Sequence, residues 1–379
     1  MLENGKIKTA QMIGSVFEGG VESCIMNYFS AIDTSKVTFD FYVDRASKII
    51  DQEKIEALGG RVIVTPHYTH IFKYIKFVRE HFKSEAYDIV HANMTSLNFI
   101  PLSIAKKCEV KVRISHAHST SNGKEKLHDL IKKILRPFSK VGATDLFACS
   151  EKAARWLYGD KEYEKGEVYI VNNAIDLSRF RYSDEVRSRV REKLGIGEKT
   201  IVLGHIGRFC EQKNHKFLLD VFSCVKEKHK DSKLILVGEG PLFDETKAYA
   251  EAKGLSGDVL FLGSSRTPEI YYSAMDAFVL PSLYEGLPIV AVEAQANGLC
   301  CFFSDEVTKE AKLLETTRYL SLGDGKEKWA DAILHIQDNV DREYGYSVLS
   351  KSKYSISNEA KRLLCRYEEL LIKERKDEY

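Results

Sequence analysis

Short apolar runs alternate with longer amphipathic segments along almost the whole chain, and this alternation is what most limits its possible folds. Each apolar run is bounded by glycine, proline or polar residues. The pattern is typical of parallel strands joined by helices, because such strands are buried on both faces of their sheet. We predict strands at residues 7–16, 39–43, 61–64, 89–92, 111–116, 146–149 and 168–171, and then at 201–206, 233–237, 259–262, 277–280 and 301–304.

With 379 residues the chain exceeds the size at which a single hydrophobic core usually stops growing. The predicted strands therefore favour an α/β protein of two Rossmann-like domains, each a doubly wound parallel sheet, facing each other across a cleft. The boundary is expected where one strand pattern ends and a helix begins at Ser183 and Asp184. We assign the N-terminal domain to 1–180, the C-terminal domain to 181–355, and a charged helix, expected to pack back on the first domain, to 356–379.

The charge and cysteine content exclude several classes of protein. The formal net charge of +1 gives no reason to expect a nucleic-acid partner, although the first half of the chain carries the surplus of basic residues. The eight cysteines include no Cys-x-x-Cys pair, which argues against a zinc site or a disulfide framework. The sequence shows neither a signal peptide nor an apolar run close to the roughly 20 residues of a membrane span. We therefore expect a cytoplasmic protein.

Ligands of open parallel sheets bind in the loops that follow the carboxyl ends of the strands. The first such loop holds Gly19 and Gly20 and opens a helix, where backbone amides can approach a phosphate closely. A tight structural turn explains these glycines equally well. A second glycine pair, Gly238 and Gly240, follows another predicted strand and also fits an ordinary turn.

Two histidines, His116 and His118, end the strand predicted at 111–116. Alternation along a strand points them to the same face. A metal site is disfavoured, because no carboxylate or cysteine accompanies the pair. Either histidine could instead be a hydrogen-bonded structural residue.

Arg208 and Lys213 follow the strand predicted at 201–206. An arginine fork and a compact lysine charge in one strand-to-helix loop can flank a diphosphate. The alternative, two solvated surface charges, leaves the neighbouring Gly207 and the Gln-Lys-Asn run at 212–214 unexplained.

The segment after the strand at 277–280 is the most informative. Pro288 fits the first turn of a helix, so the amides of Gly286 and Leu287 are left without helical partners and can face an anion.

Two glutamates, Glu285 and Glu293, are separated by seven residues in the same segment. Glu293 lies among apolar helix residues, where an unpaired carboxylate would cost several kcal/mol. The carboxylate therefore needs a partner, and ligand hydroxyls are natural ones. Two solvated glutamates are the alternative.

Taken in this order, these segments closely resemble the family-4 retaining glycosyltransferases with the GT-B fold, over nearly the whole chain. The motifs are Gly-Gly-Val-Glu, Ser-His-Ala-His, Gly-Arg-Phe with Gln-Lys-Asn, Gly-Glu-Gly-Pro, and the highly specific Glu-x7-Glu. More narrowly, the chain resembles bacterial transferases that build capsules, exopolysaccharides or lipopolysaccharides. The resemblance implies transfer of a hexose or N-acetylhexosamine from a nucleotide-diphosphate sugar, commonly a UDP-sugar, to a growing lipid-linked cell-surface glycan.

The same resemblance implies a role for each matching residue. The donor diphosphate would be bound by Gly20, Arg208, Lys213, Gly286 and Leu287. Glu293 would accept from the ribose hydroxyls, and Glu285 would contact hydroxyls of the donor sugar. His118, rather than His116, matches the active-site histidine beside the transferred sugar.

Neither a metal nor a cofactor is expected besides the nucleotide-sugar co-substrate. No Asp-x-Asp sequence occurs in the chain. Arg208 and Lys213 would replace a magnesium ion, because fixed cations stabilise the negative charge that grows on the leaving diphosphate. The N-terminal domain would bind the acceptor and the C-terminal domain the nucleotide sugar, so the site is expected to be complete only when the domains close.

Two segments of the N-terminal domain, 71–79 and 132–140, mix apolar and basic residues. Such stretches can lie on an anionic bilayer, and we expect peripheral contact with the inner membrane, where a lipid-linked acceptor would be met. An ordinary core-facing helix with a solvated face is the alternative.

Two other functions fit parts of the sequence. A nucleotide-sugar 2-epimerase can share this fold, but it does not need the complete Glu-x7-Glu segment or the Ser-His-Ala-His loop in this form. A catalytically idle partner subunit could bind nucleotide sugar without turnover, but the proposed ligand residues are all intact.

Overall fold

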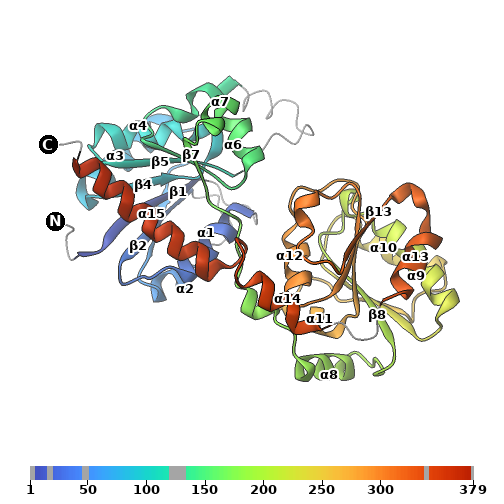
Figure 1. Ribbon diagram of the computed structural model, residues 1–379. Coiled ribbons are helices and arrows are strands. Elements are labelled where there is room, and N and C mark those ends of the chain that lie inside the picture. The colour runs from blue at the N-terminus through green and yellow to red at the C-terminus, as the bar shows by residue number, and fades with distance from the viewer. Residues whose placement is uncertain (1–4, 15–19, 45–50, 119–133, 337–340, 377–379) are drawn as a thin grey trace. The chain divides into compact units, whose positions relative to one another are not determined.

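The computed structural model describes residues 5–14, 20–44, 51–118, 134–336 and 341–376. The chain forms two compact units (Figure 1). The N-terminal unit comprises Met1–Ile175 together with Lys353–Tyr379, and the C-terminal unit comprises Asp176–Ser352. These limits differ from the boundaries expected at 180/181 and 355/356.

The difference is explained by the packing of the two segments in which the chain passes from one unit to the other. The short 3₁₀ helix Leu177–Phe180 belongs to the C-terminal unit, because the Phe180 carbonyl accepts a hydrogen bond from Asn297 Nδ2 at 2.8 Å. On the return, Ile175 pairs with Ser355 in an isolated parallel bridge, and its amide donates to the Tyr354 carbonyl at 3.0 Å. Residues 353–355 therefore belong to the N-terminal unit.

The N-terminal unit contains a parallel sheet of seven strands. The apolar runs form the strands because their alternate residues fill cores on both faces: Phe39 and Phe41 face one core, and Tyr42 faces the other. Across the sheet the order is β3 (Arg61–Thr65), β2 (Val37–Asp44), β1 (Ile7–Gly14), β4 (Ile89–Ala92), β5 (Val112–Ala117), β6 (Asp145–Ala148) and β7 (Val168–Ile170).

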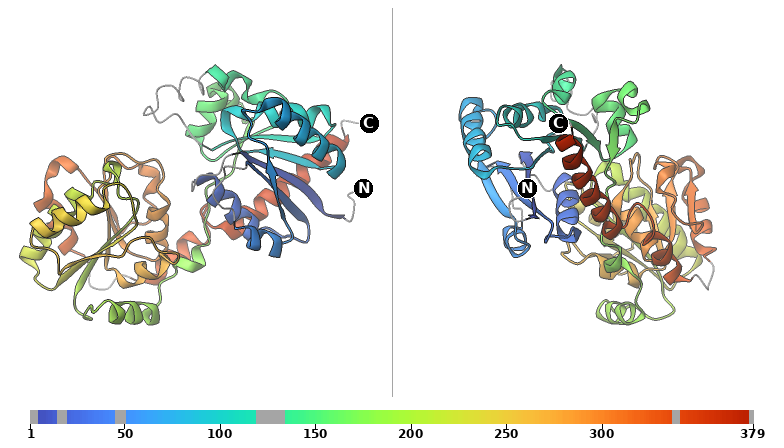
Figure 2. Two further views of the ribbon diagram at one scale, coloured as in Figure 1. Left: turned by 180° about the vertical axis from the view of Figure 1, so that it is seen from behind. Right: turned by 60° about the vertical axis from the view of Figure 1, so that its left-hand side comes forward.

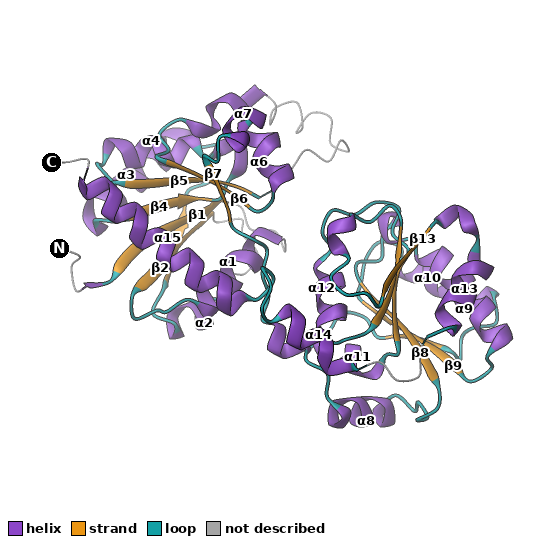
Figure 3. Ribbon diagram, viewed as in Figure 1, coloured by secondary structure: helices purple, strands orange, loops and turns teal. Residues whose placement is uncertain are grey.

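Helices cover both faces of this sheet (Figure 3). One face carries α1 (Gly20–Ala31), α2 (Gln52–Ala57) and α15 (Ile356–Lys376). The other carries α3 (Ile71–Glu85), α4 (Phe99–Lys107) and α6 (Glu151–Tyr158), with α7 (Asp160–Glu164) following α6.

The C-terminal helix α15 runs along the N-terminal unit (Figure 2). Leu363, Leu364 and Tyr367 are buried in the same core as Phe29 of α1 and Phe39 of β2. The helix begins at Ile356, where the predicted C-terminal helical segment also begins. Its apolar side chains complete one face of the N-terminal sheet.

The C-terminal unit contains a parallel sheet of six strands. Across the sheet the order is β10 (Val259–Phe261), β9 (Ser232–Val237), β8 (Ile201–Ile206), β11 (Ala277–Leu280), β12 (Cys300–Ser304) and β13 (Thr317–Leu320). One face carries α9 (His215–Lys228), α10 (Phe243–Ala252) and α13 (Lys326–Leu334). On the other side lie α8 (Asp184–Lys193), α11 (Glu269–Ala274), α12 (Ile289–Ala296) and α14 (Arg342–Leu349) (Figure 1).

The predicted strands are all present, and the expectation of two Rossmann-like parallel-sheet domains is confirmed. The predicted helix start is also correct, since the Ser183 side chain caps α8 by accepting from the Val186 amide at 3.2 Å. One strand, β13, was missed. It lies at the edge of the sheet and carries the exposed Arg318, so it lacks a continuous apolar run. Among the described residues, no helix is long and apolar enough to cross a membrane.

Candidate functional site

The strand order of the C-terminal unit reverses between β8 and β11, with β9 and β10 on one side and β12 and β13 on the other. At such a reversal the loops after the two central strands diverge and leave a crevice at the carboxyl ends of the strands. The residues predicted for the donor follow these two strands: Arg208 and Lys213 after β8, and Glu285, Gly286, Leu287 and Glu293 after β11. The structure thus brings them to one edge of the sheet.

The loop after β8 presents two cations differently. Arg208 is exposed, and no described residue forms a hydrogen bond or ion pair with it. Lys213 ends the 3₁₀ helix Glu211–Lys213, and Asn214 follows with φ of 55°, a left-handed conformation that asparagine tolerates. A Cβ on Gly207 would lie 3.3 Å from Lys213 Cε, so the glycine leaves room for the lysine stem.

Lys213 pairs with Glu285 across the two loops. The Nζ–Oε1 distance is 2.6 Å, and the two side chains are 14% and 10% exposed. Ser282 Oγ donates to the same carboxylate oxygen at 3.2 Å. An ammonium group has three donors, and among the described residues only Glu285 takes one of them. Lys213 can therefore stay paired and still bind an anion.

Gln212 fixes the loop after β11 against the loop after β8. Its side-chain amide donates to the Tyr284 backbone carbonyl at 2.9 Å. The backbone carbonyl of Gln212 accepts from the Leu283 amide at 2.8 Å. No individual role could be predicted for Gln212 from the sequence, because its partners are distant in the chain. These two hydrogen bonds of Gln212 hold Glu285 within reach of Lys213.

The start of α12 differs from the sequence prediction in one detail. Pro288 is the residue before the first helical residue, Ile289, rather than part of the first turn. Within the described part of the chain, the amides of Gly286 and Leu287 have no hydrogen-bond partner. Gly286 is exposed, and a Cβ placed on it would meet nothing within 4 Å. Packing therefore does not require a glycine at this position.

Glu293 has a protein partner that the sequence did not reveal. The Tyr272 hydroxyl, from α11, donates to Glu293 Oε2 at 2.6 Å. Burial raises the pKa of Glu293 to about 7, and the Tyr272 hydrogen bond opposes the shift. Among the described residues, Oε1 has no hydrogen-bond partner, so it can accept from a ligand hydroxyl.

The glycines after β9 are structural. Gly238 and Gly240 have φ of 138° and 158°, and a Cβ on either would overlap backbone atoms of Gly207 and Phe209 at 2.1 and 2.4 Å. These glycines allow the turn after β9 to pack closely against the loop after β8, which agrees with the ordinary turn predicted for them.

The N-terminal unit places its two histidines differently. His116 is buried, with 2% of its surface exposed, whereas His118 is partly exposed. The two rings are tilted by 35°, with their centroids 3.9 Å apart. Burial lowers the pKa of His118 to about 3, so its ring is neutral near pH 7. Gly20 is the first residue of α1, while Gly19, Ser119 and Thr120 lie outside the described residues.

The part of the chain that the structure describes contains no group of three or more histidine, cysteine or carboxylate side chains placed to hold a metal ion. The predicted donor residues after β8 and β11 are two cations, Arg208 and Lys213, two carboxylates, Glu285 and Glu293, and the amides of Gly286 and Leu287.

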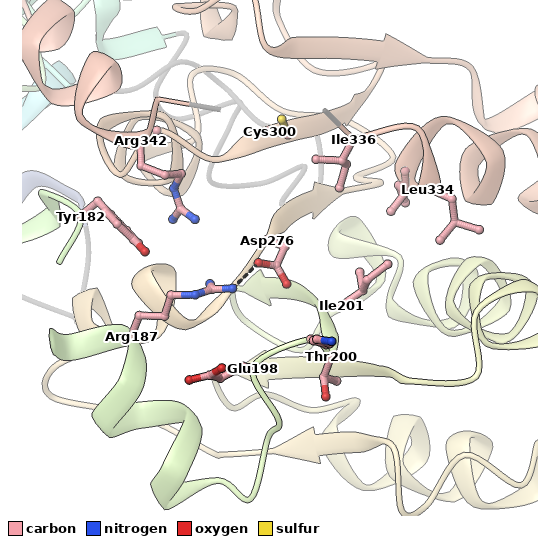
Figure 4. A pocket seen from close by; sticks show the side chains of 13 residues that line it. Tyr182, Arg187, Glu198, Thr200, Ile201, Asp276, Cys300, Leu334, Ile336 and Arg342 are labelled. Carbon is pink, nitrogen blue, oxygen red and sulfur yellow. Dashed lines mark hydrogen bonds and ion pairs between the residues drawn. The ribbon is translucent and has the colours of Figure 1, made fainter. Parts of the chain in front are cut away.

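A cavity of about 430 Å³ lies at the opposite edge of the C-terminal sheet, where Thr200 and Cys300 mark the starts of β8 and β12 (Figure 4). The arginines that line this cavity, Arg187 and Arg342, already form hydrogen bonds with protein groups. Arg187 donates to Asp276 at 2.6 Å and to the carbonyls of residues 273–275, at the end of α11. Arg342 donates to the carbonyls of residues 272, 275 and 297. These arginines hold the loop before β11 in place, and the cavity is separate from the predicted donor residues.

Comparison with known proteins agrees with the fold. Residues 18–179 match the family described as Glycosyltransferase Family 4, and residues 186–339 match Glycosyl transferases group 1. The Bacillus subtilis protein named putative glycosyltransferase EpsF is 36% identical over 343 residues, or 88% of each chain.

Two further proteins are similar to this chain. The Escherichia coli UDP-Gal:alpha-D-GlcNAc-diphosphoundecaprenol alpha-1,3-galactosyltransferase is 27% identical over 228 residues, or 59% of each chain. The crystal structure of Anabaena HepE in complex with UDP and glucose has a TM-score of 0.74 at 17% identity, covering 94% of this chain and 98% of that chain.

The two parallel-sheet Rossmann-like domains and the likeness to HepE show the GT-B fold class. Within that class, the chain belongs to the family-4 glycosyltransferases.

Proposed function

We propose that this protein is a retaining, metal-independent glycosyltransferase that moves a hexose or N-acetylhexosamine from a UDP-sugar to a growing lipid-linked glycan. HepE was crystallised with UDP and glucose, and the name of the Escherichia coli relative gives a UDP-sugar donor and a diphosphoundecaprenol-linked acceptor. Both names support the proposed substrates.

The arrangement at the β8–β11 crevice carries the proposal. Arg208 is exposed, Lys213 keeps two N–H donors, and the amides of Gly286 and Leu287 are unpaired among the described residues. Charge-assisted hydrogen bonds of this kind suit a diphosphate. Such donors also oppose the charge that develops on the leaving diphosphate without having to reorganise.

In the proposed reaction the bond between the anomeric carbon and the phosphate oxygen breaks, and a bond to the acceptor hydroxyl oxygen forms on the same face. The hydroxyl proton passes to the leaving phosphate, so no protein base is required. Glu285 holds Lys213 through Oε1, and its second oxygen remains for a hydroxyl of the donor sugar. Glu293 would accept from the ribose through Oε1.

Contact with an anionic membrane surface is proposed for the N-terminal unit. Phe72 of α3 is 86% exposed, and Ile134 and Phe138 are 61% and 50% exposed. Both α3 and the 3₁₀ helix Arg136–Lys140 pack on α4, so the two elements are neighbours in the N-terminal unit. Lys73, Lys76 and Lys140 are exposed on the same two elements. Apolar side chains flanked by lysines suit a bilayer interface.

The test of the proposed function is a transfer assay read by NMR. The protein is incubated separately with UDP-glucose, UDP-galactose and UDP-N-acetylglucosamine, each with a bacterial lipid extract that contains undecaprenyl-diphosphate-linked sugars. We expect one donor to give UDP and a product whose new linkage keeps the anomeric configuration of the donor. A product of inverted configuration would refute retention. Formation of a 2-epimerised nucleotide sugar would indicate a nucleotide-sugar 2-epimerase. Binding of the donor without turnover would indicate a catalytically idle partner subunit. Either result would refute the transferase activity.

A further inference from the structure

A buried polar cluster lies behind His118 in the N-terminal unit. Gln11, His91, Asn93, His116 and Tyr367 are each less than 5% exposed. They come from β1, β4, the residue after β4, β5 and α15, respectively. The strand order of this unit reverses between β1 and β4, so the cluster lies where an open parallel sheet places its ligands.

Asn93 connects this cluster to His118. The Asn93 side-chain amide nitrogen donates to the His91 backbone carbonyl at 3.1 Å and to Gln11 Oε1 at 2.9 Å. A backbone carbonyl can only accept, so the amide nitrogen must face it. Asn93 Oδ1 therefore faces His118 Nε2, at 2.7 Å.

This orientation decides which nitrogen of His118 carries the proton. An amide oxygen can only accept, so His118 Nε2 must donate. A neutral imidazole has one N–H, which leaves the lone pair on Nδ1. No described residue forms a hydrogen bond with Nδ1.

Tyr367 supports the cluster from the C-terminal helix. Its hydroxyl lies 2.6 Å from His91 Nδ1 and accepts from Gln11 Nε2 at 3.4 Å. His91 Nε2 in turn lies 2.9 Å from His116 Nδ1. None of these contacts is made to the Asn93 amide itself: Tyr367 contacts the ring of His91 and the amide nitrogen of Gln11, whereas Asn93 donates to the His91 backbone carbonyl and to Gln11 Oε1.

We propose that Asn93 is a positioning residue that holds His118 as the Nε2–H tautomer, so that His118 meets the substrate as a hydrogen-bond acceptor at Nδ1. The role in catalysis rests on the proposed function, in which His118 lies beside the transferred sugar. His118 then recognises a hydroxyl group and offers no donor to a phosphate oxygen.

The test uses the full-length protein labelled with ¹⁵N-histidine at pH 7. Two-bond proton–nitrogen correlations distinguish a protonated ring nitrogen from one with a lone pair, and His118→Gln identifies the His118 signals by their loss. We expect His118 to be a single Nε2–H tautomer. In Asn93→Leu we expect an Nδ1–H form to appear and kcat/KM to fall by roughly ten- to a hundredfold through misplacement of the ring.

Two further variants separate the tautomer from general disturbance of the cluster. Asn93→Asp retains an acceptor oxygen and is expected to keep the Nε2–H form, which covers the case in which Asn93→Leu fails to fold. Tyr367→Phe removes a hydroxyl from the same cluster but leaves both acceptors of the Asn93 amide, so the His118 signals should stay in place. A wild-type Nδ1–H tautomer, or equal signal changes in Tyr367→Phe and Asn93→Leu, would overturn the proposal. The spectra do not depend on turnover, so failure of the proposed function would be seen separately, as absence of transfer by the wild type.

Discussion

The carboxyl group of Glu293 changes its protonation state close to neutral pH. Burial raises the pKa of its carboxyl to about 7, and the described chain supplies one hydrogen bond, from Tyr272. Ribose hydroxyls would donate to the ionised form and so favour it. The affinity for a nucleotide sugar should therefore depend on pH near neutrality.

The first prediction concerns this dependence. If the donor binds the ionised carboxylate, lowering the pH from 8 to 6 should weaken UDP-glucose binding by about tenfold, as the carboxylate becomes protonated. Calorimetric titration at several pH values measures the effect. UDP-glucose is suitable because its diphosphate does not titrate in this range. In Glu293→Gln, binding should be weak and nearly independent of pH; the same pH dependence in both proteins would contradict the assignment.

The second prediction applies the same shift to stability. A carboxyl whose folded-state pKa is raised stabilises the fold below its unfolded-state pKa of 4.5, and this contribution is lost as the pH rises through about 7. Glu293→Gln should therefore increase the free energy of unfolding by about 3 kcal/mol at pH 8 and change it little at pH 4.5. Urea unfolding at the two pH values measures the difference. An equal effect at both would show that the carboxyl is not shifted.

The third prediction compares two glycines. Gly286 has open space where a Cβ would lie, whereas a Cβ on Gly238 would be 2.1 Å from the Gly207 carbonyl oxygen. Gly286→Ala should leave the melting temperature unchanged and weaken UDP binding, because the methyl group would occupy the approach to the amides. Gly238→Ala should lower the melting temperature by several degrees. If Gly286→Ala binds UDP normally, the diphosphate does not approach this loop.

At the scale of elements, the alternation of strands and helices could be predicted because it depends on the spacing of apolar residues over short stretches of the chain. The run at 201–206 identified a strand, and Gly207 and Arg208 after it marked the loop proposed to bind the donor. The partners Lys213–Glu285 and Tyr272–Glu293 could not be found this way, because they depend on which strands become neighbours. The edge strand β13 was missed for a related reason, since Arg318 interrupts its apolar pattern.

The fourth prediction concerns α3 and the 3₁₀ helix Arg136–Lys140. Replacing both Phe72 and Phe138 by serine should reduce flotation with vesicles of phosphatidylethanolamine and phosphatidylglycerol by at least roughly tenfold, since each phenylalanine loses apolar burial. Tyr344→Ser is the matched control, because Tyr344 is 53% exposed but lies in the C-terminal unit. Equal flotation of the double variant and the control would rule out this surface.

At the scale of the whole molecule, the two units carry different parts of the proposed machinery. The N-terminal unit holds Gly20 and His118, and the C-terminal unit holds the predicted diphosphate, sugar and ribose residues. The final helix returns to the N-terminal unit and buries Leu363 and Tyr367 there. The N-terminal unit therefore depends on a segment that follows the C-terminal unit in the chain.

The central claim is that a nucleoside diphosphate binds at the β8–β11 crevice, and calorimetric titration with UDP tests it most directly. Arg208→Ala removes the exposed cation, and Arg189→Ala makes the same charge change on an exposed residue of α8, which leads into the opposite end of β8. We predict that Arg208→Ala weakens UDP binding by roughly ten- to a hundredfold, the loss of one charge-assisted contact, and that Arg189→Ala matches the wild type. Equal affinities in all three proteins would contradict the account.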